Sequence, residues 1–171
     1  MPESGVAVAI LAFVTAQRLA ELVYARRNEA RLRARGAVEH APEHYWLIVA
    51  LHAAWLAGLW LTSTGTSPSP VWLAAFIVLQ VLRLWVLITL KDRWTTRIIV
   101  LPDAPLIAEG PYRFMRHPNY AIVTAEILVL PMMFGLYAYG VAFALANAGI
   151  LGIRIRAENH ALQVSAGRPP G

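Results

Sequence analysis

The sequence contains no cysteine, which excludes disulfides, thiolate nucleophiles and cysteine-bound zinc or iron–sulfur centres. Charge is also scarce, since 15% of the 171 residues are charged while 58% are hydrophobic. So apolar a chain does not fit an ordinary soluble domain and is typical of a small polytopic membrane protein. The formal net charge of +5 does not require nucleic acid, because basic residues of membrane proteins set orientation and contact anionic headgroups. We therefore expect membrane lipids, and no nucleic acid, as partners.

Five apolar segments are candidates to cross the bilayer, which takes about 20 residues of helix. They are Gly5–Tyr24, Tyr45–Ser63, Val71–Leu90, Tyr120–Phe134 and Tyr137–Ile153. The first three are long enough to span. The last two are short, are joined by only Gly135 and Leu136, and include Pro131, which predicts a tight helical hairpin that is tilted, kinked or partly re-entrant. The expected fold is an all-α integral membrane protein with about five transmembrane helices.

Basic residues set the expected orientation. The polar loop 25–44 and the polar segment 91–119 carry five Lys or Arg each, the charged tail from Arg154 carries three, and the turn 64–70 carries none. The positive-inside rule then places the amino terminus outside and the carboxy terminus in the cytosol. Heavy use of Ala and Arg with a single Lys favours a bacterial chain, for which the inner membrane is the expected location.

The pattern predicts one membrane domain over residues 1–171. Three amino-terminal spans occupy 1–90, with the cytosolic loop 25–44 between the first two. A functional core follows over 91–162, and 163–171 is expected to be a flexible tail. The first apolar segment lacks a basic leading region and runs directly into Arg26 and Arg27, which predicts a retained anchor and not a cleaved signal.

The stretch Glu109–Tyr120, EGPYRFMRHPNY, is an unusual group of residues between two apolar segments. Pro118 suits the first turn of a helix, so we expect a helix to begin at His117–Pro118. Its free amides, flanked by basic side chains, would attract an anion such as a carboxylate. A simpler interpretation is a turn at Gly110–Pro111, with arginines on headgroups and tyrosines in the interfacial aromatic belt. That interpretation does not explain this particular order of residues.

A second polar cluster, Arg154–Asn159, follows the fifth apolar segment. Arg154 and Glu158 are four residues apart and therefore share one helix face. Taken alone, the cluster is typical of a solvated helix end with a weak ion pair. Both clusters nevertheless leave the membrane on the same side, at the ends of two hairpin-linked helices. We therefore expect them to lie close together.

Three polar residues fall inside expected spans, namely Arg83, Glu126 and Asn147. Unpaired burial in lipid is expensive, so each is a candidate catalytic residue. A structural interhelical pair between Arg83 and Glu126 is an equally open alternative. No metal site is expected, because His40 and His44 are separated by Pro42, which breaks the helix that would align them.

The two clusters resemble the isoprenylcysteine carboxyl methyltransferase family of membrane-embedded methyltransferases. The resemblance covers about Leu90–Leu162 and rests on three elements: Trp94-Thr95, then GPYRFMRHPNY, which follows G-x-Y-R-x-x-R-H-P-x-Y, then RIRAEN with an Arg four residues before the acidic position. It implies S-adenosylmethionine as methyl donor, bound in a cytosolic pocket between the last helices and their polar segments. The cofactor-binding residues carried over by position are Leu106, Ile107, Tyr112, Arg116, His117, Tyr120, Arg154, Glu158 and Asn159.

Two departures from the family pattern stand out. The family usually has a pair of glutamates where this sequence has Glu158-Asn159, and the asparagine amide brings no charge to attract the cationic donor. The region Ala104-Pro105 replaces a histidine that the family commonly has shortly before a Leu-Val element.

The resemblance implies methyl transfer to a carboxyl, enol or phenol oxygen of a lipophilic acceptor that enters from the membrane. The amino-terminal half, including Arg18–Leu22, is similar to a bacterial branch found beside type III polyketide synthases, which methylates long-chain alkylpyrones or alkylresorcinols. Phospholipid N-methylation is the alternative enzymatic function, and a non-catalytic membrane scaffold subunit is the alternative outside the enzymes. The oligomeric state stays open.

Overall fold

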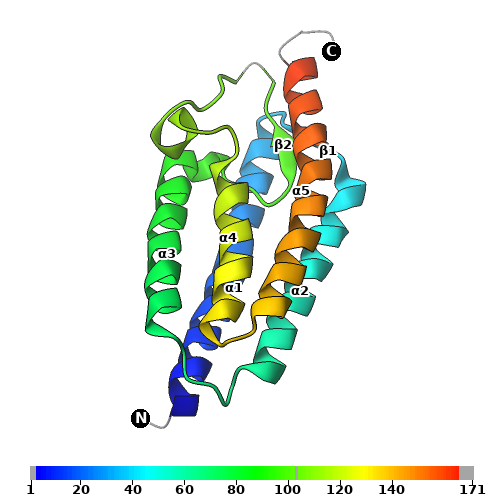
Figure 1. Ribbon diagram of the computed structural model, residues 1–171. Helices are drawn as coiled ribbons and strands as arrows, with labels where there is room; N and C mark the ends of the chain where they lie inside the picture. Colours follow the sequence, from blue (N-terminus) through cyan, green and yellow to red (C-terminus); the bar gives the residue numbers. More distant parts are fainter. Residues whose placement is uncertain (1–2, 103, 166–171) are drawn as a thin grey trace.

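The computed structural model describes residues 3–102 and 104–165. It is a helical bundle (Figure 1), which confirms the predicted all-α membrane fold. In the described part, four helices are long and apolar enough to cross a membrane, and a fifth apolar helix is shorter. The helices are α1 (Glu3–Ala34), α2 (Tyr45–Thr62), α3 (Pro70–Leu90), α4 (Pro118–Met133) and α5 (Tyr137–Ser165).

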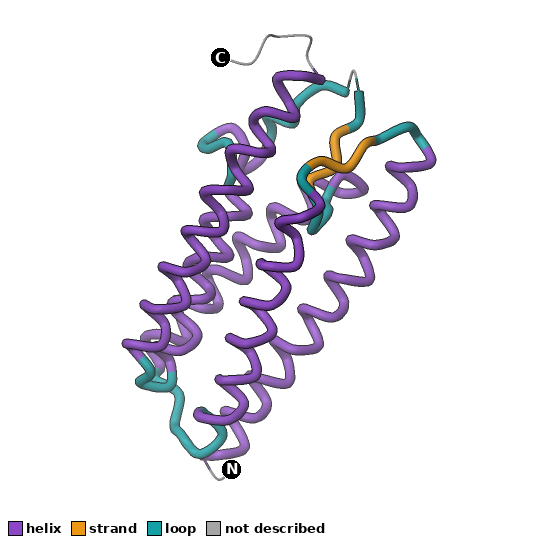
Figure 2. The backbone as a smooth tube through the Cα atoms, turned by 90° about the vertical axis from the view of Figure 1, so that its right-hand side faces the viewer, coloured by secondary structure: helices purple, strands orange, loops and turns teal. Residues whose placement is uncertain are grey.

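The connections gather at the two ends of the bundle (Figure 2). One end holds the α2–α3 and α4–α5 links and the start of α1. The other holds every longer polar segment and the last turns of α5, and we call it the ribbon end. Three short 3₁₀ helices lie there, namely η1 (Pro42–His44), η2 (Lys91–Arg93) and η3 (Gly110–Arg113).

A two-stranded ribbon at this end was not predicted. Strand β1 (Val38–His40) pairs antiparallel with β2 (Ile98–Val100), with Val38 opposite Val100. The residues of β2, two isoleucines and a valine, favour an extended strand, but three residues are too few to give a signal in the sequence. The ribbon joins the connection after α1 to the connection after α3.

Two helices run further than expected. Helix α1 continues to Ala34, through half of the predicted polar loop 25–44, and α5 continues to Ser165, through the predicted charged tail. Ala, Arg and Glu are good helix formers, so a helix does not have to end where it leaves the lipid. Of the expected flexible tail 163–171, residues 163–165 are helical and 166–171 lie outside the described residues.

Helix α4 lies at the centre, packed between α3 and α5 (Figure 1). The predicted hairpin is present, and Gly135 makes its turn with φ +77°. At Gly140 of α5 an added Cβ would lie 2.9 Å from the Leu128 carbonyl oxygen, so α4 and α5 are in backbone contact. The main core surrounds α4 and includes Leu11, Trp55, Leu59, Ile127, Leu130 and Met133.

Candidate functional site

A charged network lies inside the bundle, where α1, α3 and α4 meet. Arg83 Nε and Nη2 lie 2.5 Å from the two carboxylate oxygens of Glu21, and Arg83 Nη1 lies 2.9 Å from Glu126 Oε2. Arg18 Nη2 donates to the same Glu126 oxygen at 2.7 Å, and its Nη1 donates to Glu21 at 3.1 Å. The predicted contact between Arg83 and Glu126 is therefore present, within a set of two arginines and two glutamates.

This network is neutral and largely sealed. Glu126 is fully buried and Arg83 is 4% exposed. Gln17 donates to Glu21 at 3.1 Å and Gln80 donates to Glu126 at 2.8 Å. A buried charge is tolerated only when paired and hydrogen-bonded, and each carboxylate here has at least three donors.

The third catalytic candidate, Asn147, lies elsewhere. It is fully buried on α5, and its Nδ2 donates to Thr124 Oγ1 at 2.9 Å. Thr124 in turn donates to the Tyr120 carbonyl oxygen on α4. Asn147 thus bonds to a partner two residues before Glu126 on α4, and the three candidates do not form one group of contacting side chains. Their catalytic roles stay predictions.

The two polar clusters do meet at the ribbon end. Helix α4 begins at Pro118, as predicted, and Tyr120 Oη donates to Glu158 Oε2 of α5 at 2.8 Å. His117 Nδ1 lies 3.7 Å from the same oxygen, and its ring stacks on Tyr120 with centroids 5.4 Å apart. We call His117, Tyr120 and Glu158 the corner.

Arg154 contacts the polar segment, not Glu158, with which the simpler interpretation paired it. Its side chain is buried, at 4% exposure, and Nη2 donates to the Thr96 carbonyl oxygen at 2.8 Å. Asn28 of α1 also contacts this segment. Its Nδ2 donates to the carbonyl oxygens of Lys91, at 3.0 Å, and Trp94, at 2.9 Å. The segment that follows α3 is therefore fixed from two sides.

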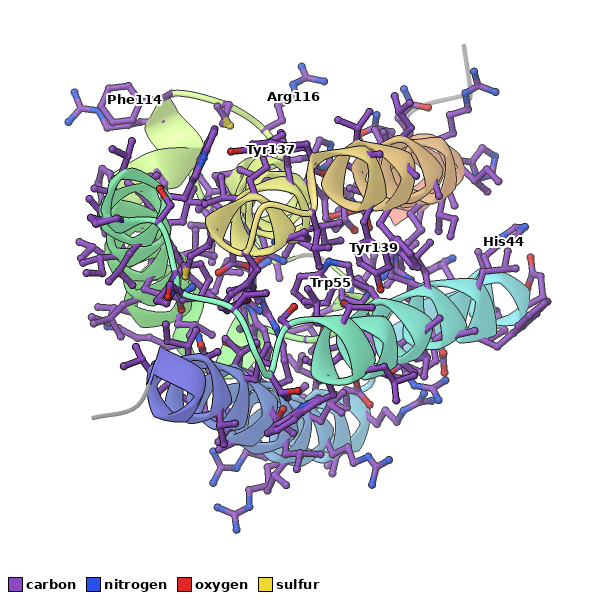
Figure 3. The ribbon with its side chains drawn as sticks, turned by 60° about the horizontal axis from the view of Figure 1, so that its bottom comes forward. His44, Trp55, Phe114, Arg116, Tyr137 and Tyr139 are labelled. Carbon is purple, nitrogen blue, oxygen red and sulfur yellow. The ribbon has the colours of Figure 1, made fainter. Side chains whose placement is uncertain are left out.

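The other cofactor candidates differ in exposure. Tyr112 is half-buried in η3, and burial together with the Glu158 carboxylate raises the pKa of its phenol, which stays protonated. Ile107 and Asn159 are half-buried. Leu106 is 68% exposed, and Arg116 is exposed and points away from the bundle (Figure 3).

The corner fits a ligand with several polar groups. Two buried atoms in the corner or next to it in sequence, His117 Nε2 and Asn119 Oδ1, have no hydrogen-bond partner among the described residues. Such atoms also occur in the charged network, on Gln17, Arg18 and Gln80, and on Asn147. Buried polar atoms are almost always paired, so each of these atoms is a candidate contact for a ligand or a water molecule.

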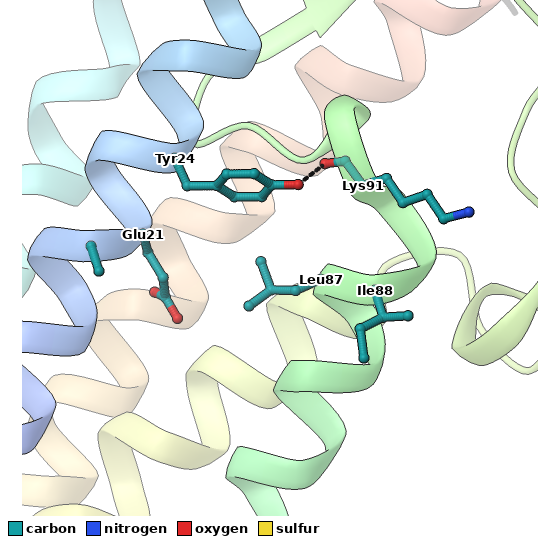
Figure 4. A pocket seen from close by; sticks show the side chains of 6 residues that line it. Glu21, Tyr24, Leu87, Ile88 and Lys91 are labelled. Carbon is teal, nitrogen blue, oxygen red and sulfur yellow. Dashed lines mark hydrogen bonds between the residues drawn. The ribbon is translucent and has the colours of Figure 1, made fainter.

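Two surface hollows lie away from the corner, between α1 and α3. They measure about 500 and 510 Å³, and none of the corner residues lines either of them. In the first, Glu21 and Tyr24 of α1 face Leu87 and Lys91, and Tyr24 Oη donates to the Lys91 carbonyl oxygen at 2.8 Å (Figure 4). We place the candidate site at the corner, because it joins the two polar clusters that the sequence singled out and because the buried His117 Nε2 has no hydrogen-bond partner among the described residues.

Sequence reasoning missed several members of these two groups. Arg18 and Glu21 fall inside the first apolar segment, and their intramembrane charge was the signal for a partner across helices. Gln80, one helical turn before Arg83, carried the same signal more weakly. Asn119 occupies the variable position of R-H-P-x-Y, so the motif gave no reason to expect a role for this residue.

An apolar bundle whose described part has four helices long enough to cross a bilayer defines a membrane protein. The chain belongs to the isoprenylcysteine carboxyl methyltransferase (ICMT) family, whose model matches residues 72–164. The match takes in α4, α5 and the corner, and family membership suggests a membrane methyltransferase.

Two curated relatives resemble nearly the whole chain. The uncharacterized protein YpbQ of Bacillus subtilis (strain 168) is 38% identical over 159 residues, which cover 90% of this chain and 95% of the relative. An uncharacterized protein of Haemophilus influenzae (strain ATCC 51907 / DSM 11121 / KW20 / Rd) is 26% identical over 162 residues, or 88% and 91% of the two chains. No solved structure matches the chain significantly.

Proposed function

We propose that the protein is a membrane-embedded, S-adenosylmethionine-dependent methyltransferase that acts on an oxygen of a lipophilic acceptor. The observation that carries the proposal is the corner, where His117 and Tyr120 at the start of α4 converge on Glu158 of α5. The family assignment supports the reaction class, and the unpaired polar atoms beside the corner support a polar ligand.

The donor supplies an activated methyl group on a sulfonium, so the protein mainly has to align two reactants and exclude water. The Glu158 carboxylate attracts a cation and is oriented by the Tyr120 hydroxyl. His117 and Asn119 offer one nitrogen and one oxygen to further polar groups. Arg154 holds Thr96, which keeps the polar segment closed over the helix ends.

We propose that the ribbon end faces the cytosol of a bacterium and that the protein lies in the inner membrane. The count of basic residues in the connections supports this orientation. A water-soluble donor then reaches the corner from the cytosol, while a lipophilic acceptor reaches it from the lipid.

For the acceptor we propose a long-chain phenol or enol, such as an alkylresorcinol or alkylpyrone. The likeness of Arg18–Leu22 to the polyketide-associated branch supports this choice, and Arg18 and Glu21 of that stretch are members of the charged network. Arg83 of α3, Glu126 of α4 and Asn147 of α5 lie further from the ribbon end than the corner, and we propose that they orient the acceptor oxygen. An ionised oxygen needs orientation more than it needs a strong base.

The test is methyl transfer by purified protein in lipid nanodiscs with isotope-labelled donor. The acceptors are an alkylresorcinol, an alkylpyrone, a prenylated cysteine and phosphatidylethanolamine, tested one at a time. We expect label in an extracted O-methyl ether or ester, and loss of donor binding in Glu158→Gln. The matched control is Glu43→Gln, an exposed glutamate of η1.

Other outcomes decide between the alternatives. Label found only in phosphatidylethanolamine would replace O-methylation by phospholipid N-methylation. Unchanged donor binding after the combined substitutions His117→Ala and Glu158→Ala would remove the corner from the site. Failure of the unmodified protein to bind the donor in calorimetry would favour a non-catalytic scaffold.

A further inference from the structure

The turn η3 lies against the side of α3, below the end of that helix. Gly110, with φ +54°, is so close to α3 that an added Cβ would clash with the Thr89 hydroxyl and lie 3.2 Å from Trp85 Nε1. The Phe114 ring meets the Trp85 ring edge-on, with centroids 6.3 Å apart. The turn is therefore held at the level of Trp85.

That level lies within the span. Helix α3 has 21 residues, about 31 Å of helix, which matches a hydrocarbon core of about 30 Å. The first charged residue after it is Lys91, and Trp85 precedes Lys91 by roughly 9 Å along the axis. Helical side chains also tilt toward the amino-terminal end, which here is the deeper end. If α3 spans the hydrocarbon layer from end to end, the Phe114 ring, packed on Trp85, is expected within that layer.

The surface of this turn is apolar and exposed. Phe114 is 72% exposed and Met115 is 49% exposed, and Figure 3 shows Phe114 projecting away from α4 and α5. On α3, Leu84 and Ile88 are likewise more than half exposed. An exposed aromatic ring continuous with a lipid-facing helix surface indicates contact with lipid.

Basic groups rim this apolar surface. Arg113 and Arg116 are exposed, and the Arg113 guanidinium carbon lies 5.3 Å from the centroid of the Phe114 ring. Arginine buries its stem along apolar surface while its guanidinium reaches the interface. Lys91 is exposed at the end of the span, and Glu109 is the acidic group of the turn. The excess of positive charge complements anionic phosphates.

We propose that Gly110–Arg116 is a membrane-inserted cap, with Phe114 and Met115 in the hydrocarbon of the ribbon-end leaflet and Arg113 and Arg116 on anionic phospholipid headgroups. Tyr112 of the same turn is half-buried toward Glu158, two residues before the lipid-facing Phe114. The cap is thus the wall that separates the corner from the leaflet. Its insertion does not depend on methyl transfer.

The natural absence of cysteine makes a direct test simple. Nitroxide labels are attached to Phe114→Cys and Met115→Cys in phospholipid vesicles, and their collision rates with oxygen and with a water-soluble nickel chelate are measured. Val81→Cys on the exposed side of α3 is the lipid reference, and Asp92→Cys is the water reference. Glu109→Cys, at the exposed position just before the cap, is the matched control.

We expect the labels at 114 and 115 to behave like the label at 81, with oxygen favoured several-fold over the chelate, and the label at 109 to behave like that at 92. Labels at 114 and 115 that collide with the chelate as often as the label at 92 would overturn the insertion. Two labelled positions guard against disturbance of the turn by loss of the Phe114 ring.

A second arm tests the headgroups. The label at 115 is compared in vesicles of phosphatidylcholine alone and with about one third phosphatidylglycerol, where we expect chelate collisions to fall roughly twofold. The decrease should vanish when Arg113→Gln and Arg116→Gln are added, and persist with Arg31→Gln on α1. Equal collision rates in the two kinds of vesicle would overturn the headgroup contact.

Discussion

Arg83 joins two carboxylates from different helices, with Glu21 of α1 at 2.5 Å and Glu126 of α4 at 2.9 Å. Three helices that are far apart in sequence are thus connected at a single guanidinium. Between helices in lipid the hydrophobic effect contributes little, so a polar contact of this kind determines how the helices pack.

Removal of one carboxylate of this network should therefore lower the free energy of unfolding more than removal of an exposed carboxylate. Glu126→Leu leaves buried Arg83 and half-buried Arg18 to share Glu21, and we expect a loss of about 3–5 kcal/mol in the free energy of unfolding. Thermal unfolding in detergent measures this, with exposed Glu43→Gln as the control. Equal melting temperatures for Glu126→Leu and the unmodified protein would contradict the structural role of the network.

Loss of the Tyr120 hydroxyl should weaken donor binding. Tyr120→Phe removes the hydrogen bond that orients Glu158 and leaves the ring stacked on His117. A hydrogen bond to a charged group contributes about 1.5–3 kcal/mol, so we expect the dissociation constant of S-adenosylmethionine to rise at least about tenfold. Calorimetric titration measures it. Tyr137→Phe, at an exposed tyrosine, should bind as before.

A second carboxylate beside Glu158 should strengthen binding of the cationic donor. Asn159→Glu restores the charge that the family usually has, at a half-buried position of α5. Because solvent screens the added charge, we expect a modest gain of roughly twofold to fivefold in affinity. Gln163→Glu adds the same charge at an exposed site of the same helix and should leave the affinity unchanged. A weaker complex in Asn159→Glu would show that the amide itself contacts the donor.

Gly110 should not tolerate a side chain. Gly110→Ala combines a positive φ with a clash against Thr89. We expect the free energy of unfolding to fall by about 1–3 kcal/mol, or the turn to move away from α3. Limited proteolysis between α3 and α4 measures the displacement. In Gly149→Ala the added Cβ meets nothing within 4 Å, so the cleavage rate should stay unchanged.

The ribbon should loosen in acid. Burial raises the pKa of Glu39, but hydrogen bonds from Arg97 and Arg33 outweigh it and lower the pKa below the usual 4.5. A carboxyl with a lowered folded pKa stabilises the structure above its unfolded pKa, and this contribution disappears as the pH falls through the folded pKa. Amide hydrogen exchange in β1 and β2, corrected for intrinsic rates, should therefore accelerate below about pH 4.5. Glu39→Gln should remove the change, whereas Glu43→Gln should keep it.

Structural features that are marked by a strong local signal in the sequence were predictable. The apolar runs located the helices, and Pro118 located the start of α4 because its ring favours a first turn. The contact between Arg83 and Glu126 was one of two open interpretations, and it was suggested by the cost of isolated charge in lipid. The hairpin brought His117 and Glu158 together once both clusters were assigned to one end.

Features that depend on a choice between partners were not predictable. Arg154 and Glu158 share a helix face, and the simpler interpretation paired them, but the Arg154 side chain reaches the Thr96 carbonyl oxygen, which no periodicity marks. The ribbon depends on three residues on each side and on the tertiary position of both connections. The ends of α1 and α5 were placed too early, because hydropathy marks the edge of the lipid and not the end of hydrogen-bonded turns.

The ribbon also constrains the order of assembly during synthesis. Strand β1 leaves the ribosome before α2, but its partner β2 follows α3, so two further helices must be inserted before the strands can pair. The Thr96 carbonyl oxygen, which accepts a hydrogen bond from Arg154, lies just before β2. It likewise has no such partner until α5 has been synthesised. A chain truncated after the second helix would therefore present an unpaired strand edge to quality-control proteases.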